Sequence, residues 1–236
     1  MMPGNIFRLQ LMADFADRRR IILRIAISAL LSLPFILVKM PAHAQATGVV
    51  MVILFTGFFG AAVANARLRA NLRLSRLKLL PISPIQLWLD LILSSVLVRL
   101  IPLMVVLGAF TIVNGRGLTL ASCIGILGFL SASLVILTVI AIGVGRIARS
   151  NGEVHLFGAL ICVVLAFVSG VAPLPERIDF LTITMGFNPI SRLLKALTAM
   201  ASGSYSITKI EFVLAIFIVG LVSVLTVYRW ISGRKS

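Results

Sequence analysis

The feature that most limits what this chain can fold into is a set of six apolar stretches, each long enough to cross a lipid bilayer. A transmembrane helix needs about 20 consecutive, mainly apolar residues, with a range of about 17 to 25. The stretches occupy residues 21–38, 48–64, 89–113, 119–144, 154–171 and 210–228. They predict an all-α, polytopic membrane protein with six transmembrane helices, which forms one transmembrane domain over residues 1–236.

Composition supports lipid as the solvent for most of the chain. Hydrophobic residues make up 60% of the 236 residues and charged residues 12%, whereas a soluble domain has about 45–50% and about 25%. Polar side chains are therefore too few to cover a soluble globule of this size. The same composition excludes a disordered chain, and two cysteines are too few for a secreted disulfide scaffold.

Basic residues are distributed unequally between the two sides of the predicted spans. With both termini in the cytoplasm, fifteen of the 22 basic residues lie on that side, six lie on the other, and Arg99 lies within a span. Cytoplasmic loops carry the excess of Lys and Arg in membrane proteins. We therefore expect a multi-pass protein of the bacterial cytoplasmic membrane with both termini inside. The net charge of +15 then reflects topology, and no nucleic-acid partner is expected.

The first apolar stretch allows a second interpretation, because residues 42–44 (AHA) imitate the cleavage site of a signal peptide. The segment before the stretch, however, contains Asp14 and Asp17, and Lys39 and Pro41 interrupt the approach to the site. We therefore keep this stretch as a span.

The loop between the second and third stretches predicts a basic amphipathic helix that ends at Pro81. Three leucines share one face and three arginines lie along its flank: Leu68, Leu72 and Leu79, with Arg69, Arg73 and Arg76. Such a helix either anchors to anionic headgroups, at about 1 kcal/mol per basic residue, or docks on a partner protein.

Two further short helices are expected outside the spans. Residues 5–17 carry a narrow polar wedge of Gln10, Asp14 and Asp17 between apolar side chains, so this segment should be an interface helix. Before the last stretch, Asn188 and Pro189 precede apolar residues at helical spacing over 190–200. That helix is too short to cross the membrane, and we place it in a broken external or re-entrant segment.

The order of these pieces resembles that of the permease subunits of type 2 ABC exporters, over nearly the whole chain. The most specific local match is residues 77–89 (LKLLPISPIQLWL), where leucines, Pro-x-Ser and the start of the third span follow one another. Residues 187–190 (FNPI) resemble the family's Asn-Pro element before the last span. The chain departs from the family between residues 65 and 81, which lack the usual glutamate and glycine.

The resemblance implies a function and a set of partners. The chain would be the permease subunit of an ATP-driven exporter and would form the translocation path as a homodimer or heterodimer. No GxxxxGKS/T phosphate loop occurs in the sequence, so two copies of a separate ABC ATPase would bind ATP and Mg²⁺, and this chain would hold no cofactor. The amphipathic cytoplasmic helix would be the coupling helix, with ATPase-coupling residues Arg67, Leu68, Arg69, Leu72, Arg73, Arg76 and Leu79.

Arg99 lies eleven residues past Trp88, about 16 Å along the third span at about 1.5 Å per residue. A central arginine is penalised by about 2.5 to 3.5 kcal/mol on insertion scales, so it should face the protein interior or a wet cavity. Arg99 either meets an anionic group on the translocation path or stabilises the seam between two permease subunits. Otherwise it is a structural arginine, satisfied by backbone carbonyls near Pro102 or by water that it draws into the membrane. Asp90 is nine residues away, on the opposite face of the helix.

Small residues form faces on two of the predicted spans. Gly57 and Gly60 do so on the second span, and Gly125 and Gly128 on the fourth. Such faces seat neighbouring helices within one subunit, or they line the translocation path or the dimer seam.

Chemically reactive residues are too scattered to predict an enzyme. The seven acidic residues occur singly, and His43 and His155 lie in no cluster with acids or cysteines, so neither a metal site nor a catalytic carboxylate pair is expected. Cys123 and Cys162 lie at different depths and should be buried free thiols. The alternative to a permease is a membrane scaffold or assembly factor, which would transport nothing and need no ATPase.

Overall fold

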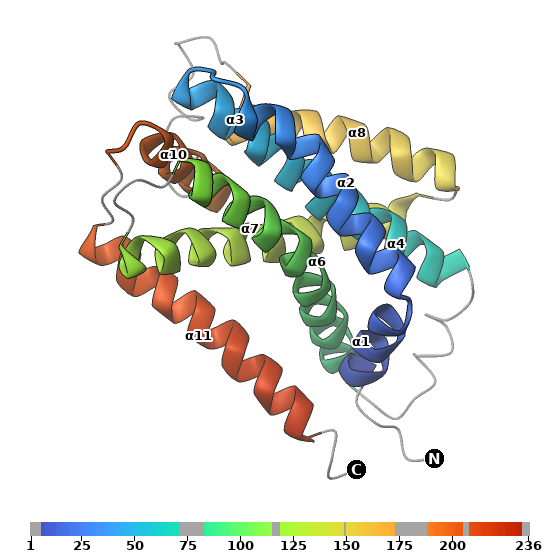
Figure 1. Ribbon diagram of the computed structural model, residues 1–236. Helices are drawn as coiled ribbons and strands as arrows, with labels where there is room; N and C mark the ends of the chain where they lie inside the picture. The colour runs from blue at the N-terminus through green and yellow to red at the C-terminus, as the bar shows by residue number, and fades with distance from the viewer. Residues whose placement is uncertain are drawn as a thin grey trace.

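The computed structural model describes residues 6–70, 83–114, 119–148, 150–172, 188–204 and 208–232. Within these ranges every regular element is helical, as predicted (Figure 1). The bounds in chain order are α1 Ile6–Ala16, α2 Arg18–Leu37, α3 Ala42–Leu54, the π-helical η1 Phe55–Phe59, α4 Gly60–Ala70, α6 Pro84–Asn114, α7 Leu120–Ile147, α8 Asn151–Val168, α10 Pro189–Ala201 and α11 Lys209–Ser232.

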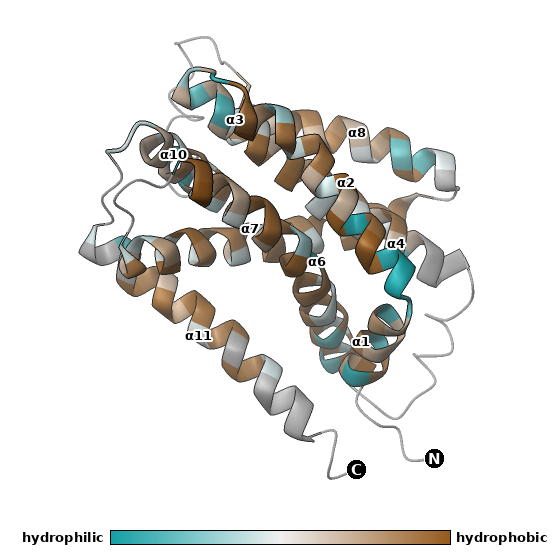
Figure 2. Ribbon diagram, viewed as in Figure 1, coloured by the Kyte–Doolittle hydropathy of each residue, from teal (hydrophilic) through white to brown (hydrophobic). Residues whose placement is uncertain are grey.

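In the described part of the chain, four helical stretches are long and apolar enough to cross a membrane. They are α2, the continuous run of α3, η1 and α4 over Ala42–Ala66, α6, and α7, and they coincide with the first four predicted spans. The fifth and sixth predicted spans fall on α8 and α11, which contain the shorter apolar stretches Gly152–Val168 and Val213–Thr226. The protein is therefore membrane-embedded and all-α. Brown, hydrophobic residues cover most of these helices in Figure 2.

Polar side chains fix where several of these apolar helices begin. In each case a side-chain oxygen accepts a hydrogen bond from a backbone N–H two or three residues further along. The capping residues are Asp17 for α2, Thr119 for α7, Ser150 for α8 and Asn188 for α10. A cap of this kind is worth about 1 kcal/mol, because the first N–H groups of a helix have no partner within it.

Helix α7 lies at the centre of the bundle. It contacts α4, α6, α8, α10 and α11 as well as η1. Leu130, Leu134, Leu137 and Ala141 follow one another at helical spacing on its inner face, and all four are fully buried. This face carries much of the apolar core.

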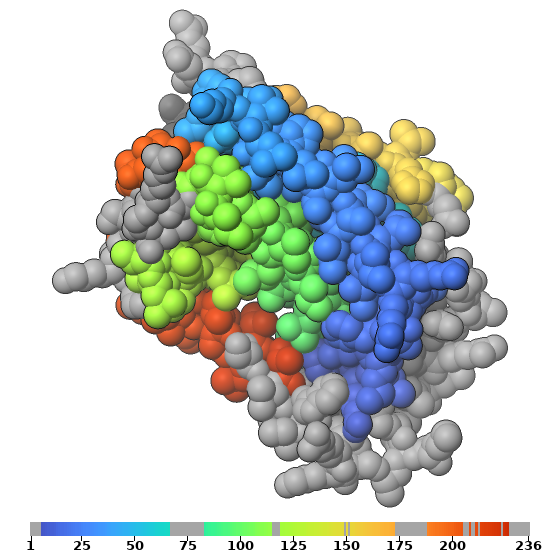
Figure 3. All heavy atoms as spheres, viewed as in Figure 1, coloured from blue at the N-terminus to red at the C-terminus, as the bar shows by residue number. Residues whose placement is uncertain are grey.

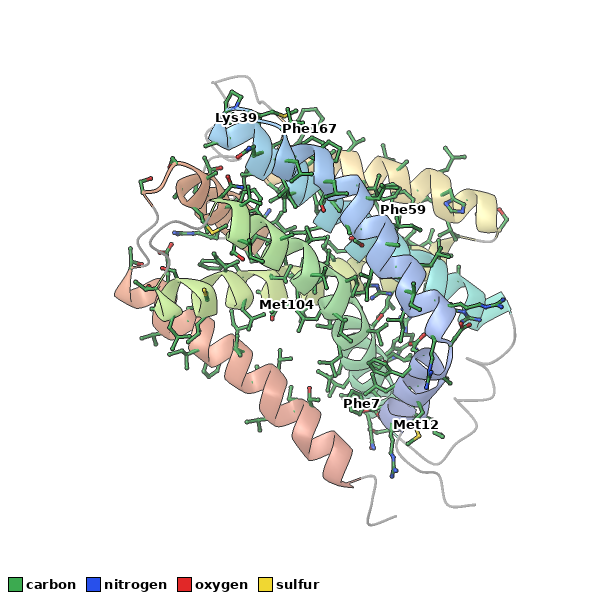
Figure 4. All side chains as sticks on the ribbon, viewed as in Figure 1. Phe7, Met12, Lys39, Phe59, Met104 and Phe167 are labelled. Carbon is green, nitrogen blue, oxygen red and sulfur yellow. The ribbon has the colours of Figure 1, made fainter. Side chains whose placement is uncertain are left out.

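The second predicted span contains a π-helical turn that no sequence pattern announces. Phe58 in this turn is fully buried, whereas the Phe59 ring stacks on His155 of α8, with ring centroids 6.2 Å apart. A Cβ atom at Gly158 of α8 would lie 2.9 Å from the Phe59 ring, so this glycine makes room for it. Phe59 is labelled in Figure 4.

Helix α10 is the short amphipathic helix expected over 190–200. Its apolar side is buried: Ile190, Leu193, Leu194, Leu197 and Met200. These residues pack α10 against α3 and α7. Lys195 on the other side is exposed, as its helical position predicts. Its placement relative to a membrane stays a prediction, as does the interface position of α1.

Both cysteines are free thiols, Cys162 half-buried and Cys123 exposed. The expectation that both are buried is therefore wrong for Cys123. This residue lies in the first turn of α7, on a side that the described helices leave uncovered.

Candidate anion site around Arg99

Arg99 occupies the middle of α6, with fifteen residues of Pro84–Asn114 on either side of it, and only 7% of the residue is exposed. Side chains on a helix lean toward its N-terminus. Arg99 therefore reaches back one turn, where its Nη1 donates to the Ser95 carbonyl oxygen at 3.2 Å and to the Ser95 hydroxyl oxygen. The backbone acceptor comes from the preceding turn of α6 and not from the neighbourhood of Pro102.

Helix α1 brings a carboxylate toward this arginine. Phe7, Leu11 and Asp14 follow one another at spacings of four and three, so they share one face of the helix. Phe7 is fully buried and packs with Leu11 against Val98 of α6, and Figure 4 shows Phe7 between the two helices. Asp14 is the polar end of this contact face.

Helix α2 adds a second arginine. Arg24 Nη2 lies 4.0 Å from Asp14 Oδ1, and the two side chains are 36% and 25% exposed, respectively. Both Arg24 and Asp14 act electrostatically on Arg99. The Arg24–Asp14 pair thus joins the two helices, α1 and α2, that pack against the helix of Arg99. Figure 2 shows hydrophilic residues at the junction of α1 and α2.

Gly60, the first residue of α4, borders the same guanidinium group. A Cβ atom at Gly60 would lie 3.4 Å from Arg99 Nε, and Gly60 is exposed. The absence of a side chain therefore leaves the Nε edge of Arg99 open. Gly57, by contrast, lies against Leu134 and Leu137 of α7 and seats a neighbouring helix within the chain.

The chemistry that this arrangement favours is anion binding. Arg99 makes no hydrogen bond to Asp90 in the described part of the chain, and Asp14 balances one of the two positive charges. A guanidinium group offers five N–H donors in a planar fork that matches carboxylate and phosphate oxygens. The cluster is thus suited to an acidic group that reaches Arg99 beside Gly60.

The predicted coupling residues are only partly placed. Arg67, Leu68 and Arg69 belong to the last turns of α4, which continues the second apolar stretch. Leu72, Arg73, Arg76 and Leu79 lie outside the described residues. The coupling role of the whole set stays a prediction.

The sequence singled out Arg99 but not its neighbours. Ser95 lies four residues earlier, so helical spacing alone could have named it. Asp14 and Arg24 come close to Arg99 only through the packing of α1 and α2 on α6, and no local pattern specifies that packing. The sequence identifies Gly60 only as a small residue, because its contact with Arg99 depends on how the π-helical turn ends.

Compared with known protein families, curated proteins and solved structures, the chain shows no match. In the part of the chain that the structure describes, no three His, Cys, Asp or Glu side chains come together as a metal site would require.

Proposed function

We propose that this chain is the permease subunit of an ATP-driven type 2 ABC exporter in the bacterial cytoplasmic membrane. Two permease subunits and two copies of a separate ABC ATPase form the transporter, with both permease termini in the cytoplasm. The sequence resemblance suggests this function. The observation that carries it furthest is the docked helix α10 between the fifth and sixth apolar helices, where the family has a broken external segment.

The contacts of α10 support such a segment. Asn188 Nδ2 donates to Ser169 Oγ at 3.2 Å, and Ser191 Oγ donates to the Ser169 carbonyl oxygen at 2.7 Å. At the other side, Arg192 Nη1 forms an ion pair with Glu211 Oε1 of α11 at 2.8 Å. Polar groups thus tie α10 to the end of α8 and to the start of α11, which agrees with a short helix that turns back without crossing.

The contact between α6 and α7 supports the proposed sidedness. Arg146, near the end of α7, lies over the Trp88 ring near the start of α6, 3.8 Å from the ring centroid. Tryptophan is enriched at both membrane interfaces, and arginine is enriched on the cytoplasmic side. The predicted coupling segment is joined to this end of α6, so we place its basic residues on the cytoplasmic side, facing the ATPase.

Arg99 has a defined position in this proposal. The side chain is 7% exposed, and a cargo would meet it at its Nε edge, which lies next to Gly60. We assign it to the translocation route or the seam between the two permease subunits, and this remains the part of the proposal that a variant must test.

The experiment is purification of the full-length, affinity-tagged chain from its native membranes in mild detergent. We expect a protein with a GxxxxGKS/T phosphate loop to co-purify in about equal amount, and the complex to hydrolyse ATP. An unrelated multi-pass protein with the same tag, purified from the same strain, is the control. Recovery of the chain without such an ATPase would contradict the proposal and favour the scaffold or assembly factor.

A further inference from the structure

The charges around Arg99 do not balance within the described part of the chain. Arg24 and Arg99 carry two positive charges, and Asp14 is the carboxylate that acts on both. Arg99 is 7% exposed and has little water to compensate for the remaining charge. An uncompensated buried charge is strongly destabilising, so an external anion would stabilise this corner.

The geometry of Arg99 leaves its binding edge available. Its hydrogen bonds to described residues both come from Nη1 and both go to Ser95. The Nε and Nη2 donors form the side of the guanidinium group that binds an oxyanion with two parallel hydrogen bonds. Nε lies next to the exposed Gly60, where a side chain would begin 3.4 Å away. An acidic group can therefore approach this edge over the backbone of Gly60.

The surface next to the two arginines is apolar. Ile27 and Leu31 follow Arg24 at spacings of three and seven, so they form one strip along α2. They are 44% and 42% exposed, and only 17% of the apolar stretch of α2 is buried within the protein. Figure 3 shows α2 on the surface of the molecule. If the acidic group of a ligand binds at Arg24, the rest of the ligand would therefore lie against the apolar strip of Ile27 and Leu31.

We propose that this corner binds an anionic glycerophospholipid of the surrounding bilayer. Its phosphate lies between Arg24 and Arg99, beside Gly60, and one acyl chain lies along Ile27 and Leu31. The apolar strip favours a lipid over free phosphate, because a free phosphate gains nothing from those side chains. This site goes beyond the proposed transport function and needs neither an ATPase nor a cargo.

The test is native mass spectrometry of the full-length protein in detergent, titrated with palmitoyl-oleoyl phosphatidylglycerol. Wild-type protein should retain one tightly bound lipid. The diacylglycerol with the same acyl chains should bind at least about tenfold more weakly, because it lacks the phosphate that forms charge-assisted hydrogen bonds. Inorganic phosphate at the lipid concentration should not displace the lipid. Displacement by inorganic phosphate would overturn the assignment to a lipid.

Three variants test the geometry of the site. Arg99→Lys keeps the charge but removes the planar fork, Arg24→Gln removes the outer charge, and Gly60→Leu fills the opening and leaves all charges in place. Each should weaken lipid binding about tenfold or more. Thermal unfolding of each variant shows whether it is folded, and Gly60→Leu keeps the test independent of any change at Arg99.

Two controls distinguish binding at this site from nonspecific electrostatic attraction of the lipid to the protein surface. Arg19→Gln removes an exposed arginine from the start of the same helix, and Gly143→Leu adds the same side chain where no atom lies within 4 Å of a new Cβ. Both should bind the lipid as wild type does. Wild-type affinity in folded Arg99→Lys or Gly60→Leu protein would overturn the proposal, as would an equal loss in Arg19→Gln.

Discussion

Gly128 of α7 faces Ala215 of α11 so closely that no second side chain fits between the helices. A Cβ atom at Gly128 would lie 2.6 Å from the Ala215 Cβ and 2.7 Å from its Cα. Ala215 is fully buried, whereas Val213, Leu214 and Ile216 beside it are between 47% and 65% exposed. This crossing is therefore a main attachment of α11 to the bundle.

Gly128→Ala should loosen that attachment. The new methyl group meets backbone as well as side-chain atoms, so the helices must separate, and overpacking of this kind costs about 1–3 kcal/mol. We expect a lower midpoint of thermal unfolding in detergent. Gly143→Ala on the same helix is the matched control, since its Cβ meets nothing within 4 Å, and it should unfold at or above the wild-type temperature. Equal midpoints for the two variants would disprove the close crossing.

A second tight contact joins α2 and α3. A Cβ atom at Gly48 would overlap Cδ1 of the Phe35 ring, so Gly48→Ala forces the ring out of its place. We expect a loss of about 1–3 kcal/mol in the free energy of unfolding, measured as a lower unfolding midpoint. Gly108→Ala on α6, where a Cβ meets nothing within 4 Å, should have no such effect.

A double variant shows whether Phe35 is the cause. Phe35→Leu shortens the side chain that blocks position 48, so Gly48→Ala should cost less in that background than in wild type. If the two substitutions are simply additive, then the helices do not meet through these residues.

The fold was more predictable from the sequence than the site. Long apolar stretches predicted α2, α6 and α7. A transmembrane helix forms its backbone hydrogen bonds within itself, and the thickness of the bilayer sets its length. The helical spacing of apolar residues after Asn188 predicted α10, because this pattern also depends only on residues close together in the sequence. The π-helical turn at Phe55–Phe59 escaped prediction because it depends on tertiary packing.

The Arg99 cluster shows the limit of such reasoning more sharply. A charge within an apolar stretch is visible in any sequence, and this pattern identifies Arg99. Its partners come from three other helices, α1, α2 and α4, and the sequence does not state which faces of these helices meet. Ser95 is the exception, because it lies on the same helix one turn away.

The proposed topology can be tested with introduced cysteines. The background for this test is Cys123→Ser with Cys162→Ser, since Cys123 is exposed and would itself react. A membrane-impermeant maleimide added from the periplasm should modify Ser204→Cys and spare Ser75→Cys in intact cells. Both should react after the membrane is opened. The reverse pattern in intact cells would overturn the orientation and the cytoplasmic placement of the coupling segment together.

The predicted coupling segment can be tested at its apolar face. Leu72→Asp combined with Leu79→Asp should reduce the amount of ATPase that co-purifies, or uncouple its ATP hydrolysis from transport, because charge replaces the apolar contacts of the docking face. Membrane insertion should be unchanged, since no span is altered. Ser204→Asp adds the same acidic group at an exposed position on the predicted opposite side, and it should leave the complex intact. Unchanged co-purification and transport in the double variant would reduce the segment to a lipid anchor.

Arg99→Leu tests whether the buried arginine serves transport or only structure. Leucine is compatible with lipid and with the apolar interior, so the variant should insert as well as wild type and assemble with the ATPase. We expect it to fail in complementing a strain that lacks the chain, because an acidic group on a cargo would no longer find the guanidinium group. Arg99→Lys, which keeps the charge, should restore part of the activity, whereas a purely structural arginine would tolerate leucine as well as lysine. Full complementation by Arg99→Leu at normal expression would remove Arg99 from the translocation route and leave it as a tolerated structural residue.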